Sequence, residues 1–160
     1  MKPSRTRVLF VCIGNSCRSQ MAEGFARAYG SDVLEPCSAG LYPATLLSPL
    51  TQKVMLEKNI DVSGHFPKTL AEIGPGRVDL VVNMSGQKLP APPGATVEDW
   101  KVPDPIGMSE DVFRTVANDI EQRVVRLVLS LRAKQQPKPA ERAAPPRRFD
   151  AARRLPDNKK

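Results

Sequence analysis

The most distinctive feature of the sequence is a cysteine followed, after five residues, by an arginine. Cys12 ends an apolar run and Arg18 precedes a helical pattern, so the residues between them form a loop from strand to helix. Backbone N–H groups of such a loop and of the helix N-terminus can surround an anion, and Gly14 lets the backbone curl tightly. An arginine holds two oxygens with its planar guanidinium. The spacing predicts an oxyanion site built from Ile13, Gly14, Asn15, Ser16, Cys17, Arg18 and Ser19.

Cys12 lies at the base of this expected cup and is our candidate nucleophile. The loop dipoles and Arg18 favour the charged form of the sulfur, and a thiolate beneath a bound phosphate is in line for attack. The hydroxyl of Ser19 could add a hydrogen bond to the sulfur. The alternative is a buried strand-end cysteine that lies near an arginine by chance. The strand before it and the helix after it favour the catalytic interpretation.

Transfer of a phosphoryl group from an oxygen ester also needs a proton for the leaving group. Asp104, in an Asp-Pro pair after the last expected strand, is the candidate general acid. Its loop follows the carboxyl end of a strand, where open parallel sheets place their sites. An Asp-Pro pair by itself is usually only a turn, but beside the cysteine loop we favour the catalytic role.

The first 135 residues alternate strand and helix patterns. Apolar runs predict strands at 8–12, 32–38, 78–84 and 96–102. Apolar residues at helical spacing predict helices at 19–29, 48–58 and 109–131, with a short helical turn at 68–73. This order predicts an α/β domain with an open four-stranded parallel sheet and helices on both faces.

Residues 136–160 differ from the rest of the chain in composition. They carry eight Lys or Arg against three Asp or Glu, so +5 of the net charge of +7 belongs to them. Phe149 and Leu155 are their only large apolar residues, too few to offset the entropy lost on ordering. We expect a disordered, basic, Pro-rich tail after a domain of residues 1–135. The alternative is a basic arm that binds nucleic acid or membrane, and we favour the solvated tail.

Cysteine, histidine and apolar content narrow the class of protein. Three cysteines, an odd number, argue against a disulfide-stapled secreted domain and favour a reducing cytoplasm. The single histidine, His65, gives no basis for a metal site or a histidine-based triad. No apolar run approaches the roughly 20 residues of a membrane span. We therefore expect a cytoplasmic protein that needs no metal or other cofactor.

Across residues 5–133 the sequence resembles the low-molecular-weight protein tyrosine phosphatase superfamily, and within it the arsenate reductases that share this fold. The resemblance rests on NSCRSQMAEGF at 15–25, SAG at 38–40, IDVSGH at 60–65, DLVV at 79–82 and Trp100 shortly before Asp104-Pro105. It implies a phosphatase-I, flavodoxin-like architecture, with Cys12 as nucleophile, Arg18 as oxyanion clamp and Asp104 as general acid. It also implies a supporting network that shapes the loop, made of Asn15, Ser19, Ser38 and His65.

The chain departs from the arsenate reductases at their resolving cysteines. Thioredoxin-coupled members carry two further cysteines after the DLVV strand, whereas Ser85 and Leu89 stand near those places here. The intramolecular relay that moves oxidation away from the active site is therefore missing. Cys37 lies in another segment, and a buried apolar thiol is its favoured interpretation.

Two further departures concern the substrate and an ion. Tyrosine phosphatases of this family usually follow Asp-Pro with an aromatic residue, whereas Ile106 and Gly107 stand here, with Tyr42 as a candidate substitute. Lys68 falls about where some relatives place an acidic ligand of potassium, so its ammonium group could replace the ion.

Three functions from different classes remain open on the sequence. Phosphomonoester hydrolysis through a cysteinyl-phosphate intermediate needs only Cys12, Arg18, the loop amides and Asp104, and we favour it. Arsenate reduction would need an external thiol, such as glutathione or mycothiol, to attack a Cys12-arsenate adduct. The third is a non-enzymatic oxyanion-binding or interaction protein. The expected partners are a phosphorylated protein, a small phosphate ester or arsenate, with an external thiol reductant in the second case.

A second cysteine lies in the same loop, five residues after the first. We expect peroxide to oxidise Cys12 to a sulfenic acid and Cys17 to condense with it into a reversible disulfide. The alternative is that Cys17 only fills space at the start of the helix.

Overall fold

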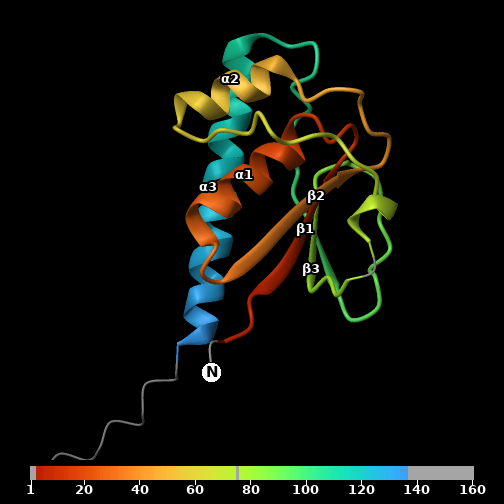
Figure 1. Cartoon of the computed structure of the whole chain (residues 1–160), viewed down its shortest axis with the longest axis vertical. Coiled ribbons are helices and arrows are strands. Elements are labelled where there is room, and N and C mark those ends of the chain that lie inside the picture. The colour runs from red at the N-terminus through yellow and green to blue at the C-terminus, as the bar shows by residue number, and fades with distance from the viewer. Residues whose placement is uncertain (1–2, 75, 137–160) are drawn as a thin grey trace, which may run out of the picture.

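Four parallel strands form the centre of the structure, a computed structural model that describes residues 3–74 and 76–136. In chain order they are β1 (Thr6–Cys12), β2 (Leu34–Gly40), β3 (Leu80–Asn83) and β4 (Thr96–Asp99). Their order in the sheet is β2-β1-β3-β4 (Figure 1). The predicted α/β class and open four-stranded parallel sheet are confirmed, although β2 ends two residues later than expected and β3 and β4 are shorter.

The strand order β2-β1-β3-β4 is the one with which a flavodoxin-like sheet begins, and it indicates where a ligand site is expected. The chain winds outward in one direction from β1 to β2 and in the other from β1 through β3 to β4. In open α/β sheets, ligands bind beyond the carboxyl ends of the strands where this direction reverses. Here that place lies between the carboxyl ends of β1 and β3, so the loop after Cys12 lies at the switch point.

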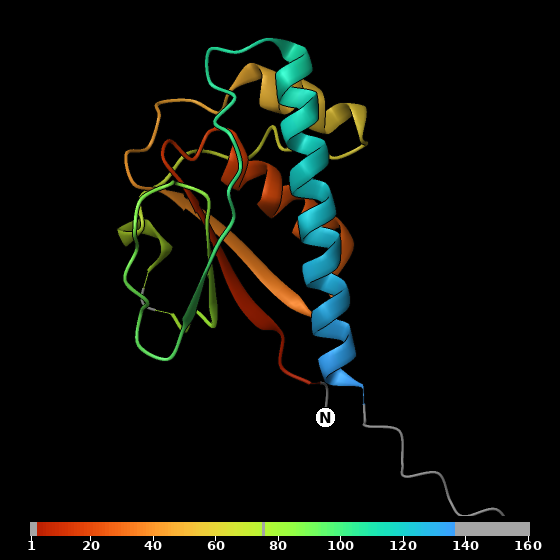
Figure 2. The ribbon, with the colours of Figure 1, turned by 180° about the vertical axis from the view of Figure 1, so that it is seen from behind.

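The three α-helices lie on one side of the sheet (Figures 1 and 2). They are α1 (Arg18–Gly30), α2 (Pro49–Glu57) and α3 (Glu110–Gln135), and all three contribute to one apolar core with the sheet. Alternate residues of β1, Val8 and Phe10, enter this core together with Phe25 of α1 and Ile120 of α3. The long apolar stripe of α3 is thus buried along most of its length, as its helical period predicts.

The opposite face of the sheet is covered by shorter elements. A 3-10 helix, η1 (Ala71–Ile73), lies there, within the helical turn predicted at 68–73. Leu9, Val11, Ala39 and Val81 form the core on this side, with Ile73 packed against it. Helical cover is therefore present on both faces but is unequal, since three α-helices lie on one and a single 3-10 turn on the other.

The last helix, α3, ends at Gln135. Within the last turn of this helix Arg132 pairs with Asp32 at 2.8 Å, which ties the end of α3 to the connection between α1 and β2. Of the predicted tail, residues 137–160 lie outside the described residues. Across the described ranges no helix is both long enough and apolar enough to pass through a lipid bilayer.

Candidate active site

The loop between β1 and α1 is held open by the segment that follows β2. The carbonyl oxygens of Ile13 and Gly14 accept backbone N–H groups of Tyr42 and Ala44, each at 2.9 Å. The carbonyl oxygen of Ser16 accepts the hydroxyl of Thr51 at 2.9 Å. In the described part of the chain, the N–H groups of Ile13, Gly14 and Ser16 have no protein acceptor. The carbonyl groups of the loop are thus bonded to other segments, and its N–H groups are the ones that could bind an anion.

The sulfur of Cys12 lies at the base of this loop and is almost fully buried, with 2% of the residue exposed. It lies 2.9 Å from the hydroxyl oxygen of Ser19 and accepts the N–H of Asn15 at 3.3 Å. Asn15 adopts a left-handed backbone conformation, with φ of 51°, that turns this N–H toward the sulfur. The sulfur therefore accepts one backbone N–H and lies against one hydroxyl, both from residues of the loop and the start of α1.

Arg18 is buried, and its guanidinium is anchored by the ends of two other segments. Nη1 donates to the carbonyl oxygens of Met84 at 2.6 Å and of Val102 at 3.0 Å. Nη2 lies 3.4 Å from Oδ2 of Asp104. The two carbonyl oxygens therefore hold the guanidinium through Nη1, and its Nη2 faces Asp104.

Asp104 contacts Arg18 from the loop between β4 and α3, and its side chain is 46% exposed. Its Oδ1 accepts the N–H of Ile106 at 3.1 Å, which orients the carboxylate. The structure therefore gathers the predicted nucleophile loop, clamp and acid from segments almost 90 residues apart in sequence. A cavity of about 520 Å³ adjoins Arg18, between the β3–β4 connection and residues 100–103.

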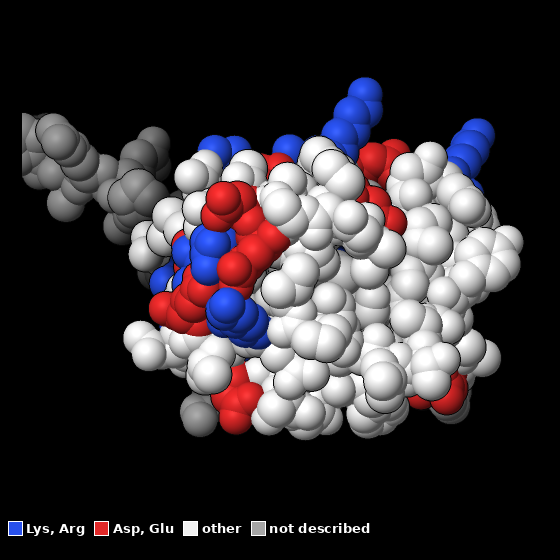
Figure 3. Space-filling model, turned by 90° about the horizontal axis from the view of Figure 1, so that it is seen from above, with Lys and Arg blue, Asp and Glu red and all other residues white. Residues whose placement is uncertain are grey.

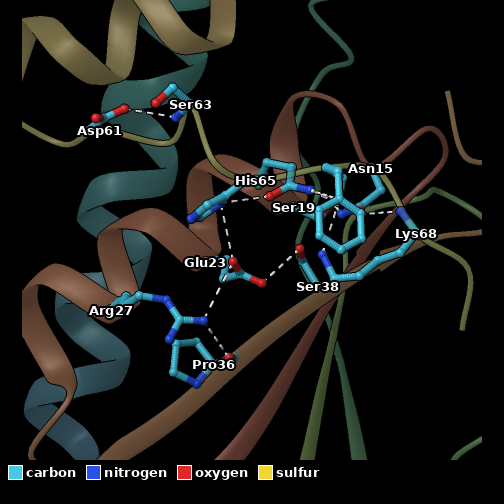
Figure 4. Close-up of polar contacts among 12 residues, drawn as sticks. Asn15, Ser19, Glu23, Arg27, Pro36, Ser38, Asp61, Ser63, His65 and Lys68 are labelled. Carbon is cyan, nitrogen blue, oxygen red and sulfur yellow. Dashed lines mark hydrogen bonds and ion pairs between the residues drawn. The ribbon is translucent and has the colours of Figure 1, made fainter. Parts of the chain in front are cut away.

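A buried hydrogen-bond network supports the loop from the side of α1 (Figure 4). Nδ2 of Asn15 donates to the hydroxyl of Ser19 at 2.7 Å. Oδ1 of Asn15 accepts Nε2 of Gln20 at 3.1 Å and the backbone N–H of Lys68 at 3.0 Å. The Asn15 amide is therefore held by three partners, and Ser19 connects it to the sulfur.

Ser38 and His65, the other two predicted members of the network, make no direct hydrogen bond to the loop among the residues that the structure describes. Ser38 donates its hydroxyl to Glu23 at 3.1 Å, and Nδ1 of His65 lies 3.3 Å from the other carboxylate oxygen of Glu23 (Figure 4). Nδ1 of His65 also lies 3.0 Å from Oε1 of Gln20. Burial lowers the pKa of His65; the Glu23 carboxylate opposes this shift, and Arg27 adds to it.

Gln20 and Glu23 are the members of this network that the sequence did not reveal. Both are buried polar residues on α1, and Glu23 also pairs with Arg27 at 3.7 Å. The spacing of Ser19, Glu23 and Arg27, four residues apart, is a signal that they share one face of a helix. Buried carboxylates need partners, so an acidic residue in line with the loop serine was a candidate for the network.

Lys68 contacts the supporting network through its backbone N–H and not through its ammonium group. Its N–H donates to Asn15, while its ammonium group donates to the carbonyl of Phe66 at 3.3 Å and lies over the Phe66 ring. The cation that pairs with the buried Glu23 carboxylate is Arg27. Replacement of an ion by the Lys68 ammonium, which the sequence left open, is not seen among the contacts of the network in the described part of the chain.

The other two cysteines are held as thiols by their surroundings. Burial raises the pKa of Cys17, an effect partly opposed by the hydroxyls of Thr51, Ser16 and Ser48. Burial also raises the pKa of Cys37, whose thiol donates to the carbonyl of Val8 at 3.5 Å. Cys37 is partly buried and packs against the core on the second face of the sheet.

Charge is unevenly distributed around the top of the molecule. Seen from above, charged side chains gather on one side, and a broad uncharged surface covers the other (Figure 3). Arg114 of α3 pairs with Glu57 of α2 at 2.9 Å, and Lys53 of α2 pairs with Glu110. These charges therefore neutralise one another in pairs.

Comparisons with known proteins place these features in a family. The model of the low molecular weight phosphotyrosine protein phosphatase family matches residues 7–137. The glutaredoxin arsenate reductase of Synechocystis sp. is 36% identical over 129 residues, covering 78% of this chain and 98% of that protein.

Solved structures agree with the sequence comparison. An arsenate reductase in the phosphate binding state matches with a TM-score of 0.71 and 36% identity, over 79% of this chain and 98% of that one. A low molecular weight protein tyrosine phosphatase from T. tengcongensis matches with a TM-score of 0.65 and 28% identity, over 78% and 99%. By family match, sequence identity and fold, the chain belongs to the low molecular weight phosphotyrosine protein phosphatase family of enzymes.

Proposed function

We propose that this enzyme hydrolyses phosphomonoesters through a cysteinyl-phosphate intermediate on Cys12. The observation that carries the proposal is the position of the Cys12 sulfur, which accepts the N–H of Asn15 and lies against the hydroxyl of Ser19. It lies at the base of a loop in which several N–H groups have no acceptor among the residues that the structure describes. This arrangement supplies a nucleophile and a cradle for the phosphoryl oxygens in one segment. Arg18 adds the positive charge that the equatorial oxygens need.

In the first step the thiolate of Cys12 attacks phosphorus and the bond from phosphorus to the leaving oxygen breaks. Protonated Asp104 gives its proton to that oxygen, so the alcohol leaves neutral. In the second step water attacks the phosphocysteine, Asp104 takes a proton from the water, and the sulfur–phosphorus bond breaks. Inorganic phosphate leaves and the thiolate is restored, so no external electron donor is required.

Arsenate reduction is the second candidate, favoured by relatives such as the Synechocystis protein that bear that name. Arsenate would condense on Cys12, and an external thiol would then supply electrons. Arsenic(V) gains two electrons and leaves as arsenite, while Cys12 is left in a mixed disulfide with the thiol. A second thiol molecule would free Cys12. Only Cys17 and Cys37 accompany Cys12, and the segment at 83–90 has none, so the reductant must be external.

One preparation tests both candidates. Turnover of para-nitrophenyl phosphate is measured beside arsenate reduction with glutathione, with mycothiol and without thiol. We expect thiol-independent turnover of the ester that Cys12→Ser abolishes. Arsenite production that depends on thiol, in a protein without ester turnover, would overturn the phosphatase proposal and establish the second candidate.

A further inference from the structure

Gln20 is a fully buried polar residue that the proposed reaction does not use. Its side-chain amide joins three groups from different parts of the chain. Nε2 donates to Oδ1 of Asn15 at 3.1 Å and to the backbone carbonyl of Phe66 at 3.0 Å. Oε1 lies 3.0 Å from Nδ1 of His65. Gln20 therefore joins residues 65–66 to the loop that holds Cys12.

Gln20, Asn15 and Ser19 form a series of hydrogen bonds that begins at the backbone carbonyl of Phe66. This carbonyl fixes which atom donates in each bond of the series. The carbonyl of Phe66 can only accept, so the amide nitrogen of Gln20 must face it, and the same nitrogen must donate to Asn15. Oδ1 of Asn15 is then the acceptor, which agrees with the Lys68 N–H that it also accepts. Nδ2 of Asn15 is consequently the donor to Ser19.

The last hydrogen bond of the series, between Ser19 and Cys12, is the one that affects the nucleophile. The oxygen of Ser19 accepts a hydrogen bond from Nδ2 of Asn15, so the Ser19 O–H is directed elsewhere, and the sulfur of Cys12 lies 2.9 Å away. A hydroxyl that donates to sulfur stabilises a thiolate and gives nothing comparable to a neutral thiol. The Phe66 carbonyl thus fixes the orientation of each group in the series, and the Ser19 hydroxyl at its end donates to the sulfur of Cys12.

We propose that Gln20 is a positioning residue for Cys12, and that it acts through Asn15 and Ser19. The inference rests on the proposed function in that it assigns a role in preparing the same nucleophile. The Lys68 N–H also donates to Oδ1 of Asn15. Removal of the Gln20 side chain therefore weakens the positioning of Asn15 but does not abolish it. One neutral hydrogen bond is typically equivalent to a factor of about two to ten in an equilibrium.

The test compares Gln20→Met with Gln122→Met, the same change at an exposed position on α3. The readouts are the pH at which half of Cys12 reacts with iodoacetamide, kcat for para-nitrophenyl phosphate, and Kd for inorganic phosphate. For Gln20→Met we expect the alkylation midpoint to rise by about 0.3 to 1 pH unit and kcat to fall about two- to tenfold. Phosphate affinity should stay within about twofold, because the loop amides and Arg18 remain.

A second background shows whether the effect travels through Ser19. In Ser19→Ala the last bond is already lost, so adding Gln20→Met should move the alkylation midpoint no further. A midpoint in Gln20→Met equal to that of Gln122→Met, or a shift that persists in full without Ser19, would overturn the proposal. Gln20→Leu serves where the Met variant does not fold. Alkylation needs no substrate, so this readout stands even if ester turnover is absent.

Discussion

Gly40, the last residue of β2, should not accept even one added methyl group. A Cβ at this position would lie 2.7 Å from the carbonyl oxygen of Ile13 and 2.9 Å from the backbone nitrogen of Asn15. Both are main-chain atoms of the catalytic loop, so the loop itself must move to accept Gly40→Ala. Overpacking of this kind costs about 1–3 kcal/mol, which for a chain of this size lowers Tm by about 2–12 °C.

The same shift should reduce catalysis. Displacing Asn15 by a few tenths of an ångström disturbs its N–H bond to the Cys12 sulfur and the loop amides, and we expect kcat to fall about three- to tenfold. The matched control is Gly64→Ala, where the added Cβ has no atom within 4 Å. Thermal unfolding and ester turnover are measured for both variants. If the two variants match in Tm and kcat, β2 does not brace the loop and the reasoning fails.

Three other predictions concern the acid, oxidation and pH. Asp104→Asn should lower turnover about 10²–10⁴-fold, and more for tyrosyl phosphate than for para-nitrophenyl phosphate, whose leaving group needs less protonation; equal losses would show that the acid lies elsewhere. Peroxide should inactivate the enzyme and dithiothreitol restore it, with a Cys12–Cys17 link in mass spectra; Cys17→Ser should lose much of the recovery, and a link to Cys37 would contradict this pairing. The backbone N–H of Arg7 lowers the pKa of Asp79, so the carboxylate stabilises the fold above its unfolded pKa and loses this effect as pH falls through the lowered folded value. Asp79→Asn should therefore be less stable than the parent protein in urea at pH 7 and equal to it in strong acid; a constant difference would assign the effect to packing.

The sheet and the catalytic loop could be predicted because their signals are local. The apolar run that ends at Cys12 is typical of a strand buried on both faces, and the spacing to Arg18 defines the loop without reference to the rest of the chain. The short strands β3 and β4 were placed correctly but with excess length, because apolar residues continue past the point where pairing stops.

The supporting network could be predicted only in part because it depends on packing between distant segments. Gln20 and Glu23 look like ordinary polar residues of a helix, and they are buried only because residues 65–68 cross over α1. The anchoring of Arg18 by the carbonyls of Met84 and Val102 was equally invisible, since a carbonyl carries no side-chain signal.

The most direct test of the central claim is to trap the covalent intermediate. The enzyme is mixed with para-nitrophenyl phosphate, quenched in acid within the first turnovers, digested, and analysed by mass spectrometry for phosphorylated peptides. Cys12→Ser serves as the negative control. The account predicts a phosphoryl group on the sulfur of Cys12 in the parent protein and none in the variant. Phosphate on another residue, or ester turnover by Cys12→Ser, would contradict it.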